Sequence, residues 1–593
     1  MGLRNEDDTL LHPAEAAMFL NVNTNGTYQY VRILETYYDE HGRHKQRVVA
    51  NLGRLDKIAP RLAELAKDLA ALGDERLVPA DRIRALDALP WGPIMLARHL
   101  WNQLGLGSTI SRQCRSHHRD FDVAEAAFVM LANRLTHPGS EHALARWLET
   151  YYVCDAEGRR WQAAWLPEEM VSKTQRVRVE SGQLAHWYRT LDALLAGRDG
   201  IERELYTRVR DLFSQKVDMV FYDVTSTYME RRRPKGIWRH GNSKDGRPRN
   251  VQVVLGVVLA NGWPIAHHVF PGDTADKSTL QTAIADVDNR FGLRRVLIVA
   301  DGGMVSEQNL QFLSAAGREV RYLFAIPGRR SEQAASALAK LTDGGWLPVD
   351  EHNRVQQVRL DESGARFFIV ESEDRKAYEQ DLRQRDMAAA AAQLQKVSKA
   401  VASGRLKQRE LIAARAARAL ATRHGNRYYA WQIAADGSFS FHEDPEKMKA
   451  ELAREGRYFL KTDDPTISPQ EAVAIYKQLS DVEWAYRDLK DIIRMRPIHH
   501  KTERRAKAHI FVATLALFVK RTLAHQLDEA GVNLSPTEAF AAMGSIGTSL
   551  LDLDGEQRLL TTSGSQHARM VVKALGITDI NPPPPNGVIE MDE

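Results

Sequence analysis

Seven segments between residues 217 and 327 constrain the fold more than any other part of the sequence. Their patterns predict the order strand, strand, strand, helix, strand, helix, strand. Asn261-Gly262 joins the second and third strands, and this dipeptide favours a type I′ hairpin turn because both positions tolerate positive φ. Three antiparallel strands followed by two helix–strand units predict an α/β fold, with a mixed sheet and helices on its faces. The segments are 217–228, 251–260, 263–270, 276–291, 295–303, 305–317 and 321–327.

Two of these predicted strands lead into a carboxylate. Asp223 follows a run in which five of six residues are apolar, and Asp301 follows the apolar strand that starts at Arg295. In open α/β sheets, ligands bind outside the carboxyl ends of the strands. We therefore expect Asp223 and Asp301 to belong to a site at that edge of the sheet.

A third carboxylate lies on a helix predicted for residues 468–495. Ser468 is its expected N-cap, with Pro469 at the first helical position and Glu471 completing a capping box. Seven positions return to nearly the same azimuth at about 3.6 residues per turn. Tyr476, Glu483 and Lys490 are spaced by seven and would share one stripe, with Arg487 one turn beyond Glu483. Taken alone, this pattern is equally typical of an exposed stripe with a Glu–Arg pair.

Asp223, Asp301 and Glu483 together form a set of oxygen donors suited to a hard divalent cation. Mg²⁺ is usually held by a few carboxylates, water and substrate phosphate. A pair of such ions can activate an attacking oxygen and stabilise the leaving oxygen in a displacement at phosphorus. The three carboxylates therefore indicate phosphoryl chemistry at the sheet edge.

The charge distribution points to the same class of partner. Net charge is only +4, from 81 basic and 77 acidic residues, but two runs are strongly basic. The segment from Arg231 to Arg249 holds eight Lys/Arg and one acid, and includes Lys244 and Arg247. The segment from Arg494 to Lys507 holds six Lys/Arg, two His and one Glu. A single basic run is often a solvated loop, but two runs beside candidate catalytic carboxylates favour a phosphate-bearing partner.

Other sequence features exclude several classes of protein. Cys114 and Cys154 are the two cysteines, so a disulfide framework and a cysteine-rich zinc module are excluded. The first thirty residues carry early acids and no long apolar run, and residues 511–519 are too short to span a bilayer. We therefore expect a cytoplasmic protein.

The chain is predicted to divide into six parts. A β-hairpin (28–52) and a helix (60–73) belong to the first, and the second is mostly helical and could hold a helix-turn-helix. A sheet-forming part follows, then an insertion, two long helices, and an end with a proline-rich acidic tail that we expect to be disordered. The parts are 1–90, 91–215, 216–330, 331–467, 468–530 and 531–593.

Five motifs, in this order, resemble those of a DDE transposase of the insertion-sequence 4 superfamily, most closely the insertion-sequence 1634 type. They are "FYDVTSTY", "GNSKDGRPRNVQVVLGVVLANGWPI", "PGDTADKSTL", "VADGGM" and "YKQLSDVEWAYRDLK". The last matches the superfamily's tyrosine–arginine–glutamate–lysine signature in spacing at Tyr476, Glu483 and Lys490. Leu479 stands where the signature has arginine, so one phosphate contact is missing unless Arg487 or a neighbour supplies it. The resemblance covers residues 210–530.

This resemblance implies an RNase H-like fold interrupted by a mainly β insertion. It also implies that Asp223, Asp301 and Glu483 ligate Mg²⁺, with Mn²⁺ as a substitute, while a homodimer holds the transposon ends and target DNA. Water would attack a phosphodiester at the transposon end, and the freed 3′-hydroxyl would then attack target DNA without a covalent protein–DNA intermediate. The expected DNA contacts are Tyr476, Arg487, Lys490, Lys244, Arg247 and Trp238, and the helical part 91–215 is expected to bind the transposon ends.

Related members form a DNA hairpin with a flipped base, and a flipped base is held by stacking on aromatic side chains. Trp238 in the basic loop, or Trp346 and Trp431 in the insertion, are candidates for such a pocket. The competing interpretation places all three in the core. His499, His500 and His509 could similarly form a metal site, although His509 on an apolar helix is more typical of packing.

Three other functions remain open. One is a domesticated or inactive copy that binds DNA without cutting it. Another is an RNase H-like nuclease without strand transfer, which the large insertion and the Tyr476-to-Lys490 signature disfavour. Glycoside hydrolysis by paired carboxylates is disfavoured by the basic surroundings.

Overall fold

The computed structural model forms two compact units, which are described separately. The first comprises Met1–Ala88 with Ser549–Leu560, and the second comprises Leu89–Thr548 with Thr561–Glu593. The structure describes residues 18–62, 64, 66, 68, 82–114, 121–161, 173–212, 219–260, 262–291, 295–301, 304, 306–315, 319–329, 331–360, 365–553, 555–583 and 588–589.

An antiparallel sheet of three strands dominates the first unit. Strands β2 (Tyr28–Tyr38) and β3 (His44–Arg54) pair as the predicted hairpin. Strand β1 (Met18–Asn25) pairs with β2 and was not predicted; its apolar residues are exposed, so no buried face marked it in the sequence. Helices α1 (Leu55–Ile58) and η1 (Ala59–Arg61) follow, and the predicted helix 60–73 lies largely outside the described residues. Strands β4 (Ile83–Pro90), β17 (Gly547–Leu553) and β18 (Glu556–Thr561) form another sheet.

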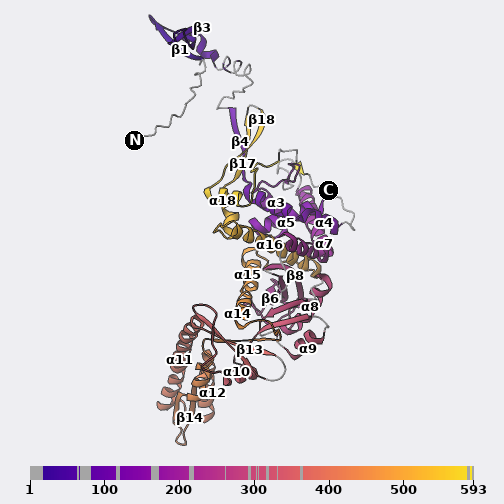
Figure 1. The fold of residues 1–593 in the computed structure, drawn as a ribbon, viewed down its shortest axis with the longest axis vertical. Coiled ribbons are helices and arrows are strands. Elements are labelled where there is room, and N and C mark those ends of the chain that lie inside the picture. The colour runs from indigo at the N-terminus through magenta and orange to yellow at the C-terminus, as the bar shows by residue number, and fades with distance from the viewer. Residues whose placement is uncertain are drawn as a thin grey trace, which may run out of the picture. The chain divides into compact units, whose positions relative to one another are not determined.

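A nine-stranded sheet organises the second unit (Figure 1), in the order β11-β12-β13-β16-β10-β9-β6-β7-β8. Strand β7 (Gln252–Ala260) is antiparallel to both β6 (Met219–Tyr228) and β8 (Trp263–Pro271). Strands β6, β9 (Arg295–Ala300) and β10 (Glu319–Ile326) are parallel. The predicted order of strands and the mixed sheet are therefore confirmed.

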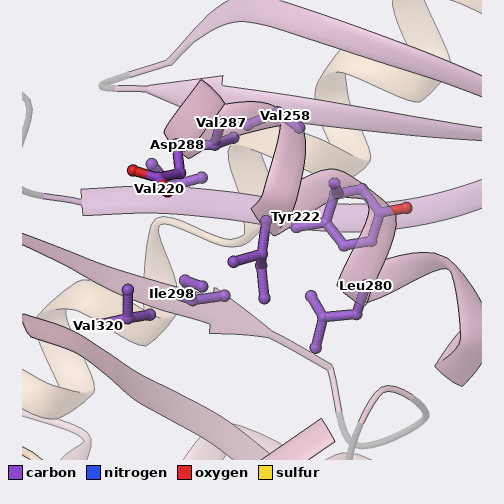
Figure 2. Close-up of a pocket in the computed structure, with 10 residues that line it drawn as sticks. Val220, Tyr222, Val258, Leu280, Val287, Asp288, Ile298 and Val320 are labelled. Carbon is purple, nitrogen blue, oxygen red and sulfur yellow. The ribbon is translucent and has the colours of Figure 1, made fainter. Parts of the chain in front are cut away.

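Each face of this sheet carries its own core, because alternate residues of a strand point to opposite faces. Phe221, Val257 and Val299 pack on the face covered by α14 (Pro469–Lys477), α15 (Ser480–Arg487) and α16 (Glu503–Glu529). Val220, Tyr222 and Ile298 pack on the opposite face with α8 (Asp276–Phe291) and α9 (Glu307–Ala315). A cavity of about 20 Å³ lies on this second face (Figure 2), where apolar side chains such as Val258 and Leu280 line it. It is a small packing defect and not a substrate site.

The insertion differs from the mainly β prediction. Its helices are α10 (Glu332–Ala339), α11 (Glu373–Ala402), α12 (Arg409–Ala421) and α13 (Pro445–Leu452). Four of its strands extend the central sheet, and β14 (Tyr429–Ile433) and β15 (Phe439–Glu443) form a separate hairpin. Residues 373–421 are rich in Ala, Arg, Lys and Glu, which favour helix over strand. The four sheet strands are β11 (Leu347–Pro348), β12 (Asn353–Arg359), β13 (Arg366–Ser372) and β16 (Arg457–Thr462).

Residues 91–215 are mostly helical, as predicted. The elements are α3 (Gly92–Gln103), α4 (Leu106–Gln113), α5 (Val123–Thr136), η3 (Glu141–Ala143), α6 (Leu144–Leu148), β5 (Arg160–Trp161) and α7 (Lys173–Leu212). Helices α17 (Pro536–Met543) and α18 (Gln566–Ala574) follow near the end. Strand β19 (Val588–Ile589), in the tail expected to be disordered, pairs with β5. Helix α16 is long and apolar enough to cross a membrane, but 78% of its apolar window is buried inside the protein.

Candidate active site

Asp301 directly follows β9, as expected, whereas Asp223 lies within the parallel neighbour β6, five residues before its end. Strands β6 and β9 pair with Phe221 opposite Val299, and each aspartate comes two residues later. Continuing that register places the two aspartates opposite each other, on strands spaced about 4.8 Å apart. Both share a face with Phe221 and Val299, because alternation repeats every two residues. This is the face that α14, α15 and α16 cover.

Glu483 reaches the same region because α15 is fastened to β6 beside Asp223. The hydroxyl of Tyr486, one turn after Glu483, donates a hydrogen bond to the backbone carbonyl of Asp223. The same hydroxyl accepts from the backbone N–H of Val257 at 3.1 Å. Tyr486 is fully packed against the sheet, whereas Glu483 is exposed. The helix therefore presents Glu483 next to the strand that carries Asp223.

The carboxylates influence each other electrostatically. Burial raises the pKa of Asp223 to about 6; the Lys244 ammonium opposes this shift, and Asp301 and Asp276 add to it. Burial also raises the pKa of Tyr476, and the charges of Asp301 and Glu483 contribute to that rise. The negative charges of Asp301 and Glu483 therefore both act on the Tyr476 hydroxyl. A cluster of like charges with a partly buried member favours binding of a cation.

Residues 468–495 do not form the single regular helix that was predicted. The capping box at Ser468 and Glu471 is confirmed, but α14 ends at Lys477 and α15 begins at Ser480. Asp488–Ile492 then continue as a π-helical turn. Leu479, at the break, is buried in the core, which explains why an apolar residue occupies this position. The simple seven-residue stripe therefore does not extend from Tyr476 to Lys490.

Lys490 is held by a buried carboxylate from the basic loop. Its Nζ lies 2.7 Å from Oδ1 of Asp245, which also contacts Nη1 of Arg496 at 2.5 Å. The Asp245 side chain is 1% exposed and that of Lys490 is 10% exposed. Arg496 in turn pairs with Asp491 at 2.5 Å. In this structure Lys490 thus joins the basic loop to the π-helical turn after α15, and its side chain is not open to a DNA phosphate.

Replacing Asp245 should therefore destabilise the protein. Removing one partner of a buried ion pair costs about 3–5 kcal/mol, and we expect the low end for Asp245→Ala because Arg496 keeps Asp491 and some water. Asp491→Ala removes an exposed partner of the same arginine, so about 1 kcal/mol or less is expected. Thermal melting compares the two variants. Equal melting temperatures would show that the buried pairing contributes nothing.

Two regions of the chain match family models of transposases. Residues 216–519 match the transposase DDE domain, and residues 20–81 match the N-terminal domain of the IS1634 family transposases. The chain belongs to the DDE transposases of the IS1634 type. The match to the DDE domain contains Asp223, Asp301 and Glu483. The match to the N-terminal domain contains β2, β3 and all but the first two residues of β1.

Two solved transposase structures show weak likeness to this transposase. The synaptic complex of piggyBac transposase with hairpin DNA is 8% identical, with a TM-score of 0.33, covering 76% of this chain and 79% of that chain. The paired-end complex of Mos1 transposase with the left transposon end is 13% identical, with a TM-score of 0.14, covering 34% and 60%. No curated protein matches the chain.

The structure places four other predicted DNA-contact residues as follows. Lys244 lies 3.3 Å from Asp276, and its Nζ donates to the carbonyl of Val224 at 2.5 Å. Arg247 and Arg487 are exposed, and the Arg487 guanidinium lies 5.1 Å from the centroid of the Trp484 ring. Tyr476 is half-buried, with its ring 5.8 Å from that of Tyr458.

The structure does not support Trp238 as a stacking surface for a base. Its side chain is 1% exposed and packs in the core with Phe221 and Val253, so no ring face is open. Trp346 lies under Arg354, and Trp431 packs beside Phe439; both are half-buried. The packing interpretation therefore fits Trp238 best.

Sequence reasoning missed two residues beside the acids. Asp276 lies within the quoted "PGDTADKSTL" motif and lines a polar pocket of about 260 Å³ with Thr225, Asn242 and Lys244. Trp484 directly follows Glu483 and is 54% exposed. Trp484 could have been identified because it is adjacent to Glu483 in the sequence. Asp276 could not, because no sequence spacing indicates that it lies near Asp223.

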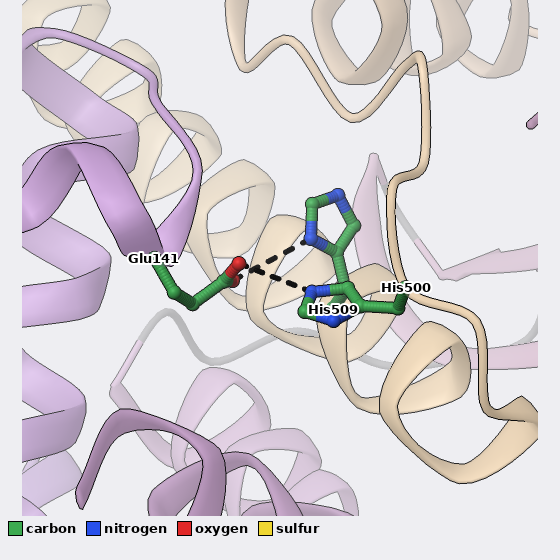
Figure 3. A group of neighbouring side chains, drawn as sticks. All are labelled: Glu141, His500 and His509. Atoms are coloured by element: carbon green, nitrogen blue, oxygen red, sulfur yellow. Dashed lines mark ion pairs between the residues drawn. The ribbon is translucent and has the colours of Figure 1, made fainter. Parts of the chain in front are cut away.

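A second cluster of ligand-type side chains lies outside this site. Glu141, His500 and His509 place carboxylate and imidazole atoms within 4.8 Å of one another (Figure 3). Arg134 already neutralises the cluster, because its Nη2 lies 3.1 Å from Nδ1 of His509 and 3.7 Å from Glu141. The other ring nitrogen of His509 lies 3.1 Å from the carbonyl of Met495, to which it donates. Both nitrogens are thus satisfied, which confirms the packing role of His509; His499 is exposed.

Proposed function

We propose that this transposase cleaves phosphodiesters at insertion-sequence ends and joins the freed 3′-ends to target DNA. Asp223, Asp301 and Glu483 would form the metal-dependent site for both steps. The observation that carries the proposal is the matching register of the two aspartates, together with Tyr486 holding the Glu483 helix against Asp223. Strands β8-β7-β6-β9-β10 would form the RNase H-like core.

The residues present fit Mg²⁺, with Mn²⁺ as a substitute. All three side chains offer carboxylate oxygens, the donors that hard divalent cations prefer. Burial raises the pKa of Asp223, and the neighbouring charges of Asp301 and Asp276 add to that rise, so a bound cation would be favoured beside it. When bound, the cation would polarise the scissile phosphate and lower the pKa of the attacking water.

The surrounding side chains would hold the DNA. Arg487 is an exposed cation one turn after Glu483 on α15, and Arg247 is an exposed cation beside the ring of Tyr228 at the end of β6. Lys244 lies where a phosphate could replace its partner Asp276. Such contacts fix the position of a duplex without reading its sequence. Tyr476 would orient a backbone oxygen between Asp301 and Glu483. Two transposon ends must be cut and joined together, so a homodimer on DNA is the expected assembly.

A strand-transfer assay tests this function. A labelled duplex with the element's own ends is incubated with a target plasmid and Mg²⁺. The wild type should yield cleaved ends joined to the plasmid, and Asp301→Asn should yield neither product. Asp343→Asn, at an exposed position in the insertion, is the matched control and should behave as wild type.

Each other outcome points to an alternative function. Cleavage without joining would contradict strand transfer and favour an RNase H-like nuclease. Binding without cleavage, in Mg²⁺ and in Mn²⁺, would favour a copy that acts as a DNA-binding protein. Full activity in Asp301→Asn would remove Asp301 from the site.

A further inference from the structure

The end of α11 and the segment after it, which includes α12 and returns along α11, carry an unusual excess of positive charge. Residues 396–427 contain nine Lys/Arg and one acid, Glu410. We call this set the α11–α12 basic surface. Its basic members are Lys396, Lys399, Arg405, Lys407, Arg409, Arg415, Arg418, Arg423 and Arg427.

The near half of α11 is different, because its charges neutralise one another. Residues 373–386 contain five acids and four bases. Arg375 pairs with Glu379 at 3.0 Å, and Arg385 pairs with Asp381. Such i,i+4 pairs are typical of a helix face that only meets solvent. The same helix therefore changes from balanced to strongly positive along its length.

Few cations of the basic surface are neutralised by a carboxylate. Arg423 lies 3.5 Å from Asp386, and Arg409 donates to the carbonyl of Ile433 at 3.1 Å. Five others are exposed and form no ion pair with the part of the chain that the structure describes; they are Lys396, Lys399, Arg405, Lys407 and Arg415. Like charges held this close repel each other, so the arrangement is costly unless an anion binds.

A packed core holds these cations in place. Leu394 and Val397 of α11 pack against Ile412 and Ala416 of α12, and the β14–β15 hairpin closes the cluster with Phe439. Lys396 and Lys399 flank Val397 and face outward. Figure 1 shows α11 and α12 running beside each other, with β14 at the far end. The positive charge thus lies on a firm scaffold and not on a loose tail.

The position of the surface suits a duplex that extends beyond the active site. Helix α11 starts directly after β13 of the central sheet, and Lys396 comes 23 residues after its first residue, Glu373. At about 1.5 Å per residue, Lys396 lies roughly 35 Å along the helix from the sheet, and Asp386, which Arg423 contacts, lies roughly 20 Å along it. Duplex DNA carries one negative charge per about 1.7 Å of its axis, so it can meet charges this far from the cut site.

We propose that the α11–α12 basic surface binds the phosphate backbone of duplex DNA independently of its sequence, away from the phosphodiester that is cut. The inference rests on the proposed function, because it assigns a second contact to the same DNA partner. Long Lys and Arg side chains bind phosphate oxygens, and such contacts position a duplex without specifying its sequence.

Salt-dependent binding tests the proposal. The neutralised variant combines Lys396→Gln, Lys399→Gln, Arg405→Gln, Lys407→Gln and Arg415→Gln. The matched control keeps every charge, with Lys396→Arg, Lys399→Arg, Arg405→Lys, Lys407→Arg and Arg415→Lys. Full-length proteins bind a 60-bp random-sequence duplex that lacks the element's ends, about 60 bp being long enough to span both sites at 3.4 Å per base pair. Thermal melting and helix content confirm that each variant folds.

Each phosphate contact adds about 0.9 to the slope of log affinity against log salt, so losing five should reduce the slope by about 4. We expect the neutralised variant to bind at least about tenfold more weakly at 0.1 M salt, with the charge-conserving control near wild type. Nicking of a short duplex that carries one element end should persist in both variants. The basic surface would add a DNA contact to the proposed function, and cleavage would not depend on that contact.

Two results would overturn the proposal. Unchanged slope and affinity in the neutralised variant, with end nicking intact, would refute the basic surface and leave the proposed function standing. Equal losses in the neutralised and charge-conserving variants would show a structural role for these residues and no charge-based contact. Failure of the wild type to bind or nick any end duplex would instead refute the proposed function itself.

Discussion

Asp223→Asn should abolish cleavage while making the metal-free protein more stable. Losing a metal-ligating carboxylate removes several kcal/mol of transition-state stabilisation. At 1.36 kcal/mol per factor of ten, a loss of about 4 kcal/mol lowers the cleavage rate about a thousandfold. Asparagine keeps the size and shape of the side chain, so the loss reflects the missing charge and not a change in packing.

The gain in stability follows from the buried charge. Burial raises the pKa of Asp223 to about 6 from an ordinary value of 3.8. Because the folded-state pKa is the higher one, wild-type stability falls as pH rises from about 4 to about 6, and the charged carboxylate then costs up to about 3 kcal/mol. The neutral amide of the Asp223→Asn variant would carry no such cost. The variant should therefore melt higher than wild type at pH 8 in EDTA, and the difference should vanish below about pH 4.

Metal titration separates this explanation from simple repacking. Adding Mn²⁺ at pH 8 should raise the melting temperature of the wild type, because a ligand that binds only the folded state stabilises it. The same addition should leave Asp223→Asn unchanged. Asp343→Asn is the control and should respond like wild type. A variant that still gains stability from Mn²⁺ would place the ion elsewhere.

The sheet and two of its acids could be predicted because local patterns determine them. Apolar runs on either side of the Asn261-Gly262 dipeptide predict the antiparallel pair β7 and β8, which the structure confirms, although Asn261 itself lies outside the described residues. The apolar run before Asp301 marks a buried parallel strand. The capping box at Ser468 likewise marks the start of α14. Each of these signals depends only on neighbours within a few residues.

Long-range packing determines what could not be predicted. Asp245 reads as part of an exposed basic loop, but Lys490, 245 residues away, buries it. Trp238 lies in that same loop and packs in the core against strands that come together only when the chain folds. Helical periodicity did not predict the break between α14 and α15, because the break depends on Leu479 packing into the core. None of these contacts has a local signature.

The insertion shows how a family expectation can override the residues. Most of residues 373–421 belong to the helices α11 and α12, in keeping with their richness in Ala, Arg, Lys and Glu. The mainly β description came from the resemblance alone. The strands of the insertion instead extend the central sheet, with β16 pairing between β13 and β10. The partner strands β10 and β13 lie far from β16 in the sequence, and pairing over such a separation leaves no local sequence pattern from which it could be predicted.

The central claim is that three carboxylates distant in sequence form one catalytic site. The register of β6 and β9 brings Asp223 and Asp301 together, but it says nothing of Glu483, which lies on a helix. Glu483→Gln should cut a labelled end duplex about a thousandfold more slowly in Mg²⁺, for the same loss of about 4 kcal/mol. End binding should survive, because glutamine keeps the shape of an exposed side chain. Glu503→Gln, on the exposed start of α16, is the matched control and should cut like wild type.

Cleavage and end binding by Glu483→Gln, measured on the same duplex, form the most direct test of this account. Lost cleavage with intact binding is the predicted result and would make Glu483 the third acid of the site. Wild-type cleavage by Glu483→Gln would contradict the account and shift the search to Asp481 or Asp488 on the same helix.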